Sequence, residues 1–421
     1  MKKMHNIKEL IKKLCPNGVE YKPLWSITIW DKKFNGVEKK KQSKIISYYY
    51  YLASEFEKIE QLEGDIIYIS TGITDRNRYT TSELAEGHIS DGEIVCIPWG
   101  GTPNVKYYKG KFITGDNRIA TSIDTKILSN KFLYYCLQSK IDLISSFYRG
   151  SGIKHPDMKK VLEFKIPVPP IEVQNEIVRI LDYFTELEAE LEAELEARIK
   201  QFEYYREFLI NNNYENIVQL KDLCTIKGRI GFRGYTTRDI VDKGQGAISL
   251  SPGNINNETI NYDKCTYISW KKYDESPEIM INNGDIVICK TGSTLGKVAM
   301  IERLPEKATL NPQLVVLKNL KCNSYYLKYI IGGYFFQNEM QSKKGLGSVP
   351  NISQKDIGNI KIKLHSTDKQ NNIAKKLYSL DKLCNDISEG LPAEIEARRK
   401  QYEYYRDKLL NFKELKVENK E

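Results

Sequence analysis

The sequence has few of the residues from which metal centres and many active sites are built. Only four of its 421 residues are histidine, and none of the eight cysteines belongs to a C-x-x-C pair or lies at a metal-ligand spacing from a histidine. We therefore expect no metal site. Cysteines scattered through a lysine-rich chain that has no apolar signal segment predict a reduced, cytoplasmic protein. No stretch approaches the roughly 18 apolar residues of a membrane helix, so we expect no membrane partner.

Two glycine-containing stretches come close to nucleotide-binding motifs but lack essential residues. KTGSTLGKVAM, which begins at Lys290, has three residues between its glycines, one fewer than a P-loop. Val298 follows its second lysine, where a P-loop has the hydroxyl that binds Mg²⁺. GRIGFRGYTTRDI, which begins at Gly228, does not match the dinucleotide fingerprint. We therefore expect that this chain binds no cofactor.

No set of residues typical of catalysis is present either. PDMKK, at Pro156, matches a nuclease motif only in part, because Asp157 is its sole carboxylate. The histidines are dispersed, and nothing matches the Asn-Pro-Pro-aromatic motif of adenine methyltransferases. The sequence therefore predicts that the chain is not an enzyme.

What the sequence does contain is an internal repeat. EARIKQFEYYREFLI (196–210) and EARRKQYEYYRDKLL (396–410) match at ten of fifteen places. Three further pairs keep the same order: VEYKPLWSI with VQLKDLCTI, GEIVCIPWGGT with GDIVICKTGST, and KIPVPPIEVQNEI with KIKLHSTDKQNNI. A period of about 200 residues is too long for a solenoid. The repeat therefore predicts two related domains, each followed by a helix.

The expected fold is α+β with a pseudo-two-fold repeat. Short β-like runs bounded by Gly, Asn and Pro alternate with amphipathic helices that start near Asn130 and Asn323, each a potential N-cap. A single apolar stripe on each repeated helix predicts a long helix with a coiled-coil or bundle seam, for which the other copy is the simplest partner. Pro392 and Gly390 predict a kink or break in the second helix. The expected divisions are a first domain (1–170), a first long helix (171–213), a second domain (214–366) and a second long helix with the C-terminal tail (367–421).

Charge and loop composition favour DNA as the partner of the two domains. The net charge is +9, yet residues 186–196 hold six glutamates in eleven positions, so cationic and acidic surfaces are separated. A glycine-rich loop that carries two arginines, an aromatic residue and hydroxyls suits DNA, because Arg reads guanine edges, hydroxyls take phosphates and glycine lets the backbone approach. The alternative is a solvated surface turn. The candidate DNA-binding residues are Lys39, Lys40, Lys41, Lys44, Thr71, Trp99, Thr102, Lys106, Arg149, Lys154, His155, Arg229, Arg233, Tyr235, Thr236, Lys290, Ser293, Lys297, Lys343, Lys344 and Ser348.

The whole pattern resembles the specificity subunit of type I restriction–modification systems. The resemblance covers nearly the entire chain and rests on PNGVEYKPLWSI, PVPPIEVQNEIVRILD, GDIVICKTGSTLGKVAM and the two EAR-x-KQ-x-EYYR helices. The second counterpart of PPIEVQ, HSTDKQ, departs from the pattern because it has no prolines.

This resemblance implies two target-recognition domains, each reading half of a split, asymmetric DNA site. It implies that the two long helices form an antiparallel coiled coil that acts as a ruler between the domains. These helices would hold two copies of an adenine methyltransferase subunit, through which restriction and translocase subunits join. S-adenosylmethionine, ATP and Mg²⁺ would then act on those partners. The repeated residues off the apolar stripe are the candidates for partner binding: Arg198, Tyr204, Arg206, Arg398, Tyr404 and Arg406.

Two other functions stay open on the sequence alone. The chain could be a DNA methyltransferase or nuclease whose motifs are not recognised. It could also be a coiled-coil interaction scaffold without a DNA function, in which case binding to duplexes would select no sequence and would depend little on salt.

Overall fold

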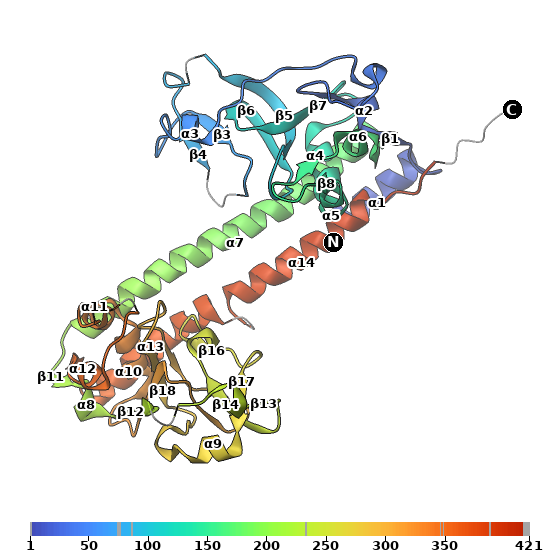
Figure 1. Ribbon diagram of the computed structural model, residues 1–421. Helices are drawn as coiled ribbons and strands as arrows, with labels where there is room; N and C mark the ends of the chain where they lie inside the picture. Colours follow the sequence, from blue (N-terminus) through green and yellow to red (C-terminus); the bar gives the residue numbers. More distant parts are fainter. Residues whose placement is uncertain are drawn as a thin grey trace. The chain divides into compact units, whose positions relative to one another are not determined.

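The computed structural model describes residues 2–73, 77–85, 87–231, 234–345, 347, 349–386 and 389–415. The chain divides into two compact units (Figure 1). The first comprises residues 1–189 and 397–421, and the second comprises residues 190–396. Each unit therefore contains the beginning of one long helical segment and the end of the other.

A six-stranded sheet forms the centre of the first unit, in the order β2-β7-β5-β6-β3-β4. All neighbours are antiparallel except β3 and β6. The strands are β2 (Thr28–Trp30), β3 (Ile66–Ile69), β4 (Arg78–Thr80), β5 (Ser90–Pro98), β6 (Lys106–Thr114) and β7 (Asn117–Ser122). The other elements are α1 (Lys2–Leu14), β1 (Tyr21–Pro23), α2 (Leu24–Ile27), η1 (Lys39–Gln42), α3 (Ala53–Phe56), α4 (Asn130–Gln138), α5 (Ile141–Ser146), β8 (Tyr148–Arg149), β9 (His155–Pro156), α6 (Met158–Glu163) and β10 (Lys165–Pro167).

The second unit contains two four-stranded sheets, ordered β12-β21-β18-β19 and β13-β17-β14-β20. The inner strands of the first of these sheets, β18 and β21, are apolar runs buried on both faces. The strands are β11 (Asn216–Gln219), β12 (Thr225–Gly228), β13 (Ile240–Val241), β14 (Gly246–Leu250), β15 (Ile255–Asn256), β16 (Thr259–Ile260), β17 (Thr266–Ser269), β18 (Ile286–Cys289), β19 (Val298–Met300), β20 (Ala308–Leu310), β21 (Leu314–Lys318) and β22 (Lys361–Leu364). The helices are α8 (Leu220–Leu223), η3 (Thr237–Asp239), η4 (Pro252–Asn254), α9 (Trp270–Asp274), η5 (Pro277–Ile279), α10 (Ser324–Gly332), α11 (Tyr334–Ser342), α12 (Gln354–Gly358) and α13 (Thr367–Asn385).

The glutamine shared by the two repeated motifs has the same task in both units. Gln174 is buried, and its side-chain oxygen accepts a hydrogen bond (2.9 Å) from the Ser129 backbone N–H just before α4. Gln370 is equally buried and accepts one (3.1 Å) from the Asn323 N–H just before α10. Each side-chain amide ties the start of a long helix to the start of the helix packed against it. This explains why HSTDKQ keeps the glutamine while it lacks the prolines.

The expected N-caps are confirmed in one unit and wrong in the other. Asn323 caps α10 by accepting from the Tyr326 N–H at 3.0 Å. In α4 the cap is Ser129, and Asn130 is the first helical residue. The Asn130 side chain instead accepts a hydrogen bond (2.7 Å) from the Ser122 N–H at the end of β7. The Asn130 side chain therefore bonds to a distant strand instead of capping its own helix.

The long helices follow the expected pattern, including the break. The first is continuous, α7 (Ile171–Asn211), whereas the second consists of α13 and α14 (Leu391–Leu410). A side chain at Gly390 would lie within 2.8 Å of the carbonyl oxygens of Asp386, Lys382 and Leu383, so only glycine fits there. In the first unit α7 and α14 run antiparallel: Phe184 stacks on Tyr405 (5.5 Å between ring centroids) and Arg399 pairs with Glu188 at 2.9 Å.

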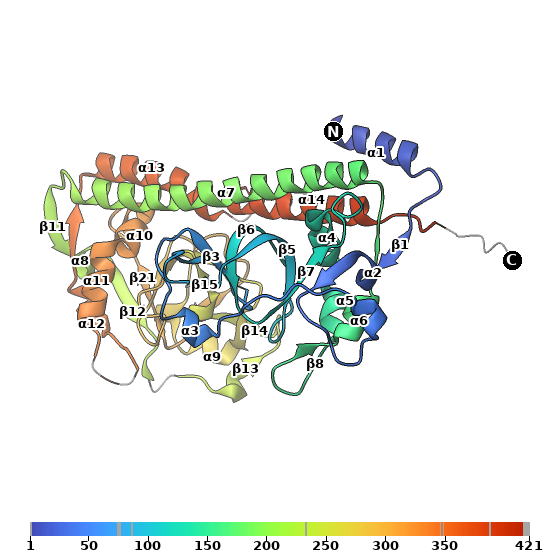
Figure 2. The same ribbon diagram turned by 90° about the horizontal axis from the view of Figure 1, so that it is seen from above.

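The C-terminal segment of the chain packs against the start of the first unit. The Val19 N–H donates to the Lys413 oxygen (2.9 Å) and the Leu415 N–H donates to the Val19 oxygen (2.8 Å). The Tyr21 hydroxyl donates to the Phe412 oxygen at 3.0 Å. The figures show the segment that follows α14 passing close to β1 (Figures 1 and 2). No sequence pattern predicted this contact.

Candidate nucleic-acid interface

In the first unit, two glycine-containing loops that are far apart in sequence lie against each other. The Gly101 N–H donates to the Lys154 oxygen (3.1 Å), and the His155 Nδ1 lies 2.8 Å from the Trp99 oxygen. A side chain at Gly100 would come within 2.9 Å of Ile153, so glycine permits this close approach. The structure therefore brings together the candidates from the two loops, which are Trp99, Thr102, Arg149, Lys154 and His155.

The loop after β3 joins the same cluster through Asn104 and Lys106. The Asn104 side-chain amide donates to the oxygens of Thr71 and Thr102, both at 3.0 Å. The Lys106 ammonium donates to the backbone oxygens of Ser70 and Gly72, both at 2.6 Å. Burial lowers the pKa of Lys106. The amine therefore holds this loop in place, which favours a structural role; its contact with DNA stays a prediction.

A buried arginine contacts the Trp99 ring of this cluster. Arg118 is 1% exposed, pairs with Asp31 at 2.8 Å, also contacts Asp116, and lies 4.9 Å from the Trp99 ring centroid. The Asp31 carboxylate in addition accepts a hydrogen bond (3.1 Å) from the Ile119 N–H. The sequence analysis missed Arg118, because it lies in a β-strand pattern rather than in a glycine loop.

The lysine run of the first unit lies on a different element. It forms η1, which packs beside α2, and Lys41 pairs with Glu163 of α6 at 2.5 Å. Lys40 and Lys41 both hydrogen-bond Glu38, which lowers the pKa of that carboxyl to about 2. Lys39 and Lys44 are exposed. These four predicted DNA contacts are therefore not brought together with the glycine loops.

The second unit repeats the loop pairing. The Gly292 N–H donates to the Pro350 oxygen (2.8 Å), the Ile352 N–H donates to the Lys290 oxygen (3.0 Å), and the Thr291 hydroxyl donates to the Asn351 side chain (2.8 Å). Ser293 is exposed at the tip. The remaining lysines there have partners of their own: Lys297 with the Ile255 oxygen (3.0 Å), Lys343 with Glu339 (3.1 Å) and Lys344 with Gln341 (3.3 Å). Ser348 lies outside the described residues.

The glycine-rich loop that begins at Gly228 is partly folded into the unit. Arg229 is 4% exposed, and its guanidinium donates to the Leu310 oxygen (3.0 Å) and the Thr309 hydroxyl (3.1 Å). Burial lowers its pKa. Tyr235 accepts a hydrogen bond (2.9 Å) from Ser249, and Thr236 caps η3. These bonds favour a structural role for Arg229, and Arg233 lies outside the described residues.

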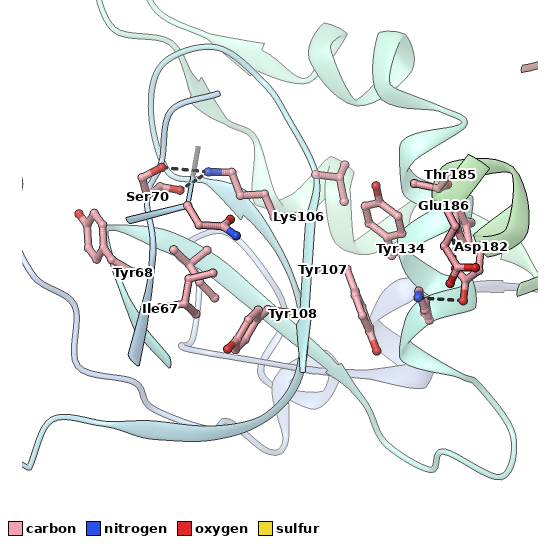
Figure 3. A pocket seen from close by; sticks show the side chains of 15 residues that line it. Ile67, Tyr68, Ser70, Lys106, Tyr107, Tyr108, Tyr134, Asp182, Thr185 and Glu186 are labelled. Carbon is pink, nitrogen blue, oxygen red and sulfur yellow. Dashed lines mark hydrogen bonds and ion pairs between the residues drawn. The ribbon is translucent and has the colours of Figure 1, made fainter. Parts of the chain in front are cut away.

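A cleft of about 470 Å³ opens in the first unit between β6, α4 and α7 (Figure 3). On its floor Lys131 pairs with Asp182 at 2.8 Å, and the Tyr135 hydroxyl donates to the same carboxylate at 2.5 Å. A similar contact exists in the second unit, where the buried Asp381 pairs with Lys328 (2.7 Å) and accepts a hydrogen bond from Tyr329 (3.0 Å). The shared arrangement joins α4 or α10 to a long helix, so we interpret these residues as structural.

The repeated EYYR segments present some side chains to solvent and bury others. Tyr204 and Tyr404 are 64% and 59% exposed. Arg206, in contrast, pairs with Glu258 of the β15–β16 hairpin at 2.8 Å, and Arg406 contacts Asp407 at 2.9 Å. Arg198 bonds Glu194 (2.8 Å), and Arg398 bonds Gln401 (3.3 Å). Of the six candidates for partner binding, the two tyrosines are therefore the most accessible.

The described residues were also compared with the requirements of a metal centre and of a membrane helix. In the part of the chain that the structure describes, no group of three or more His, Cys, Asp or Glu side chains could hold a metal ion. No helix there is long and apolar enough to cross a membrane.

Comparison with known proteins identifies the family. The family model described as the type I restriction modification DNA specificity domain matches residues 53–201 and again residues 211–397. The chain belongs to this family. The specificity subunit of the Escherichia coli EcoR124I/EcoR124II restriction enzymes is 34% identical over 304 residues, which cover 70% of this chain and 74% of the relative. A putative type I specificity subunit of Haemophilus influenzae is 30% identical over 350 residues, covering 78% and 86%.

Solved structures show the same fold. The S subunit of a type I restriction–modification system from M. genitalium aligns with a TM-score of 0.58 at 17% identity, covering 93% of this chain and 96% of that one. The expected family and the expected α+β fold with two related domains are therefore confirmed. As a type I specificity subunit, the chain is a DNA-recognition protein and is not itself an enzyme.

Proposed function

We propose that this specificity subunit reads a bipartite, asymmetric DNA site, one half with each unit, in the cytoplasm. The observation that carries the proposal is the pairing of glycine loops at equivalent places in both units, with different side chains at their tips. Trp99, Arg149 and His155 occur in the first unit, whereas Lys290 and Ser293 occur in the second. Two loop pairs that are placed alike but carry different side chains suit two half-sites of different sequence.

The division of labour between charged and polar groups follows from DNA chemistry. Lysine and arginine on phosphates supply most of the affinity, and a few side chains at base edges supply the selectivity. Glycines in both loop pairs let the backbone approach the duplex closely. The glutamates of residues 186–196 would repel phosphate, so this part of α7 suits a spacer or a protein contact.

We further propose that the repeated helices dock two copies of a DNA methyltransferase subunit, through which restriction and translocase subunits join. The relatives are named as parts of type I restriction enzymes. Tyr204 and Tyr404 occupy equivalent, exposed positions in the two repeats, which suits two copies of one partner. S-adenosylmethionine, ATP and Mg²⁺ would act on those partner subunits.

Unit-specific variants test the two-reader proposal. We expect Arg149→Ala to relax or change only the first half of the methylated motif, and Lys290→Ala to change only the second half. Sequencing of methylated adenines in cells that express each variant measures this. Lys126→Ala is the control, because Lys126 is exposed in the first unit but lies outside the loops. Loss of both half-site preferences from one substitution would contradict the proposal.

A further inference from the structure

The tryptophan of the second unit, Trp270, is exposed to solvent. Trp270, the first residue of α9, is 44% exposed, while Trp30 is 5% exposed. Trp25 and Trp99 are half-buried and lie against Lys41 and Arg118 respectively. Tryptophan is highly buried on average, so an exposed one beside exposed cations is a candidate contact surface.

The strand register places Lys307 at the same end of the sheet as Trp270. Ser269, at the end of β17, faces Gly246 at the start of β14, and β14 runs parallel to β20 with Ile248 facing Ala308. The residue after β17 and the residue before β20 therefore lie at the same end of the sheet, where β14 begins. These are Trp270 and Lys307, and the Lys307 ammonium lies 5.8 Å from the Trp270 ring centroid.

The next element along the sheet adds a third cation to the same edge. Ile240 of β13 faces Ile268 of β17. Arg238, two residues before β13, therefore lies at the same end of the sheet as Trp270. Lys271 follows Trp270 directly. Arg238, Lys271 and Lys307 are all exposed, and none forms an ion pair with another described residue. Lys272, in contrast, is neutralised by Glu275 at 2.7 Å.

This edge continues into the glycine-rich loop that begins at Gly228. Thr236, near the end of that loop, caps η3, which leads directly into β13. Because β13 pairs with β17, and α9 follows β17 directly, α9 lies beside the end of that loop. Figure 2 shows α9 and β13 on the side of the unit opposite to α13. An exposed indole beside cations suits nucleic acid. Aromatic rings stack on the bases of single strands, apolar side chains insert between base steps of a duplex, and cations bind the flanking phosphates.

We propose that Trp270 is a DNA contact of the second unit, with its indole packed on the duplex and Lys271 and Lys307 on the flanking phosphates. This inference rests on the proposed DNA-reading function and extends it, because an indole has a single hydrogen-bond donor and no acceptor and so cannot read a base edge through two hydrogen bonds. Trp270 would therefore favour base-pair steps that unstack easily. It would recognise the deformability of the duplex rather than form hydrogen bonds to base edges. A protein partner on the same patch is the competing outcome.

The test uses the chain assembled with its methyltransferase subunit and a duplex that carries the methylated site. We expect Trp270→Ala to weaken binding about tenfold, which corresponds to about 1.4 kcal/mol, and Trp270→Phe to recover most of it. Lys307→Gln and Lys271→Gln should each reduce the salt dependence of binding by about one phosphate contact. Tyr334→Ala is the matched control, because Tyr334 is an aromatic residue of the same unit with 70% exposure.

The outcomes separate this inference from the function on which it rests. Equal affinities for wild type, Trp270→Ala and Lys307→Gln would overturn the inference while leaving DNA reading intact. A variant that binds DNA normally but fails to assemble with the methyltransferase subunit would assign the patch to a protein contact and also overturn it. A wild-type complex that binds no duplex selectively would overturn the proposed function itself.

Discussion

Two buried arginines show how a side chain's partners decide its role. Arg118 pairs with the carboxylates of Asp31 and Asp116, and the Arg229 guanidinium donates to a backbone oxygen and a hydroxyl inside the second unit. Sequence reasoning selected Arg229 because it lies in a glycine-rich loop, and it missed Arg118 because it lies in a strand. Composition indicates what a loop could bind, but it does not reveal toward which side a guanidinium points.

Removal of Arg118 should be costly, because it leaves Asp31 buried without its cation. We expect Arg118→Met to lower the free energy of unfolding by about 3–5 kcal/mol, since an uncompensated charge remains inside. Urea unfolding of the purified chain measures this. The double variant Arg118→Met/Asp31→Asn should be less unstable than the single variant, because it removes both charges.

An exposed arginine of the same unit provides the control. Arg149 has a side chain that is 64% exposed and lies 3.7 Å from Asp157. We expect Arg149→Met to change the unfolding free energy by less than about 0.5 kcal/mol. If the double variant at Arg118 and Asp31 were as unstable as Arg118→Met alone, burial of the Asp31 charge would not be the cause.

At the scale of elements, the periodic features could be predicted and the non-local ones could not. The apolar stripe predicted the long helices, and Gly390 with Pro392 predicted the break between α13 and α14. The packing of residues 412–415 against Val19 and Tyr21 had no signal, because it joins opposite ends of the chain through backbone groups. The pairing of glycine loops is non-local in the same way, although the loops themselves were recognised.

Gly18 is the residue that permits the C-terminal segment to pack. Its φ of +105° lies in the region that favours glycine, and a side chain there would come within 2.4 Å of the Lys413 oxygen. We expect Gly18→Ala to cost about 1–3 kcal/mol and to free the C-terminal segment. Hydrogen exchange at the Leu415 amide, which donates to Val19, should rise more than exchange within the central sheet.

Gly36 offers a control that separates backbone strain from the clash. It also has a positive φ, +76°, but a side chain there would meet nothing within 4 Å. Gly36→Ala should therefore carry a similar backbone penalty without affecting the C-terminal segment. Equal exchange at Leu415 in both variants would contradict the role given to Gly18.

For the whole molecule, the duplication explains both what is shared and what differs. Each unit contains parts of both long helical segments, the same buried glutamine and the same Tyr–Asp–Lys contact beside a long helix. The sheets that carry the loops differ, with six strands in one unit and two sets of four in the other. The two units thus share their framework but differ in the sheets that carry the loops, which agrees with the proposal of two different half-sites.

The central claim is that this chain gives its partners a two-part DNA target. Its most direct test is sequencing of methylated adenines in cells with and without the chain, with the methyltransferase gene present in both. The account predicts one motif of two unlike halves separated by an unread spacer, lost completely when the chain is deleted. A motif that persists without the chain, or a single undivided palindrome, would contradict it.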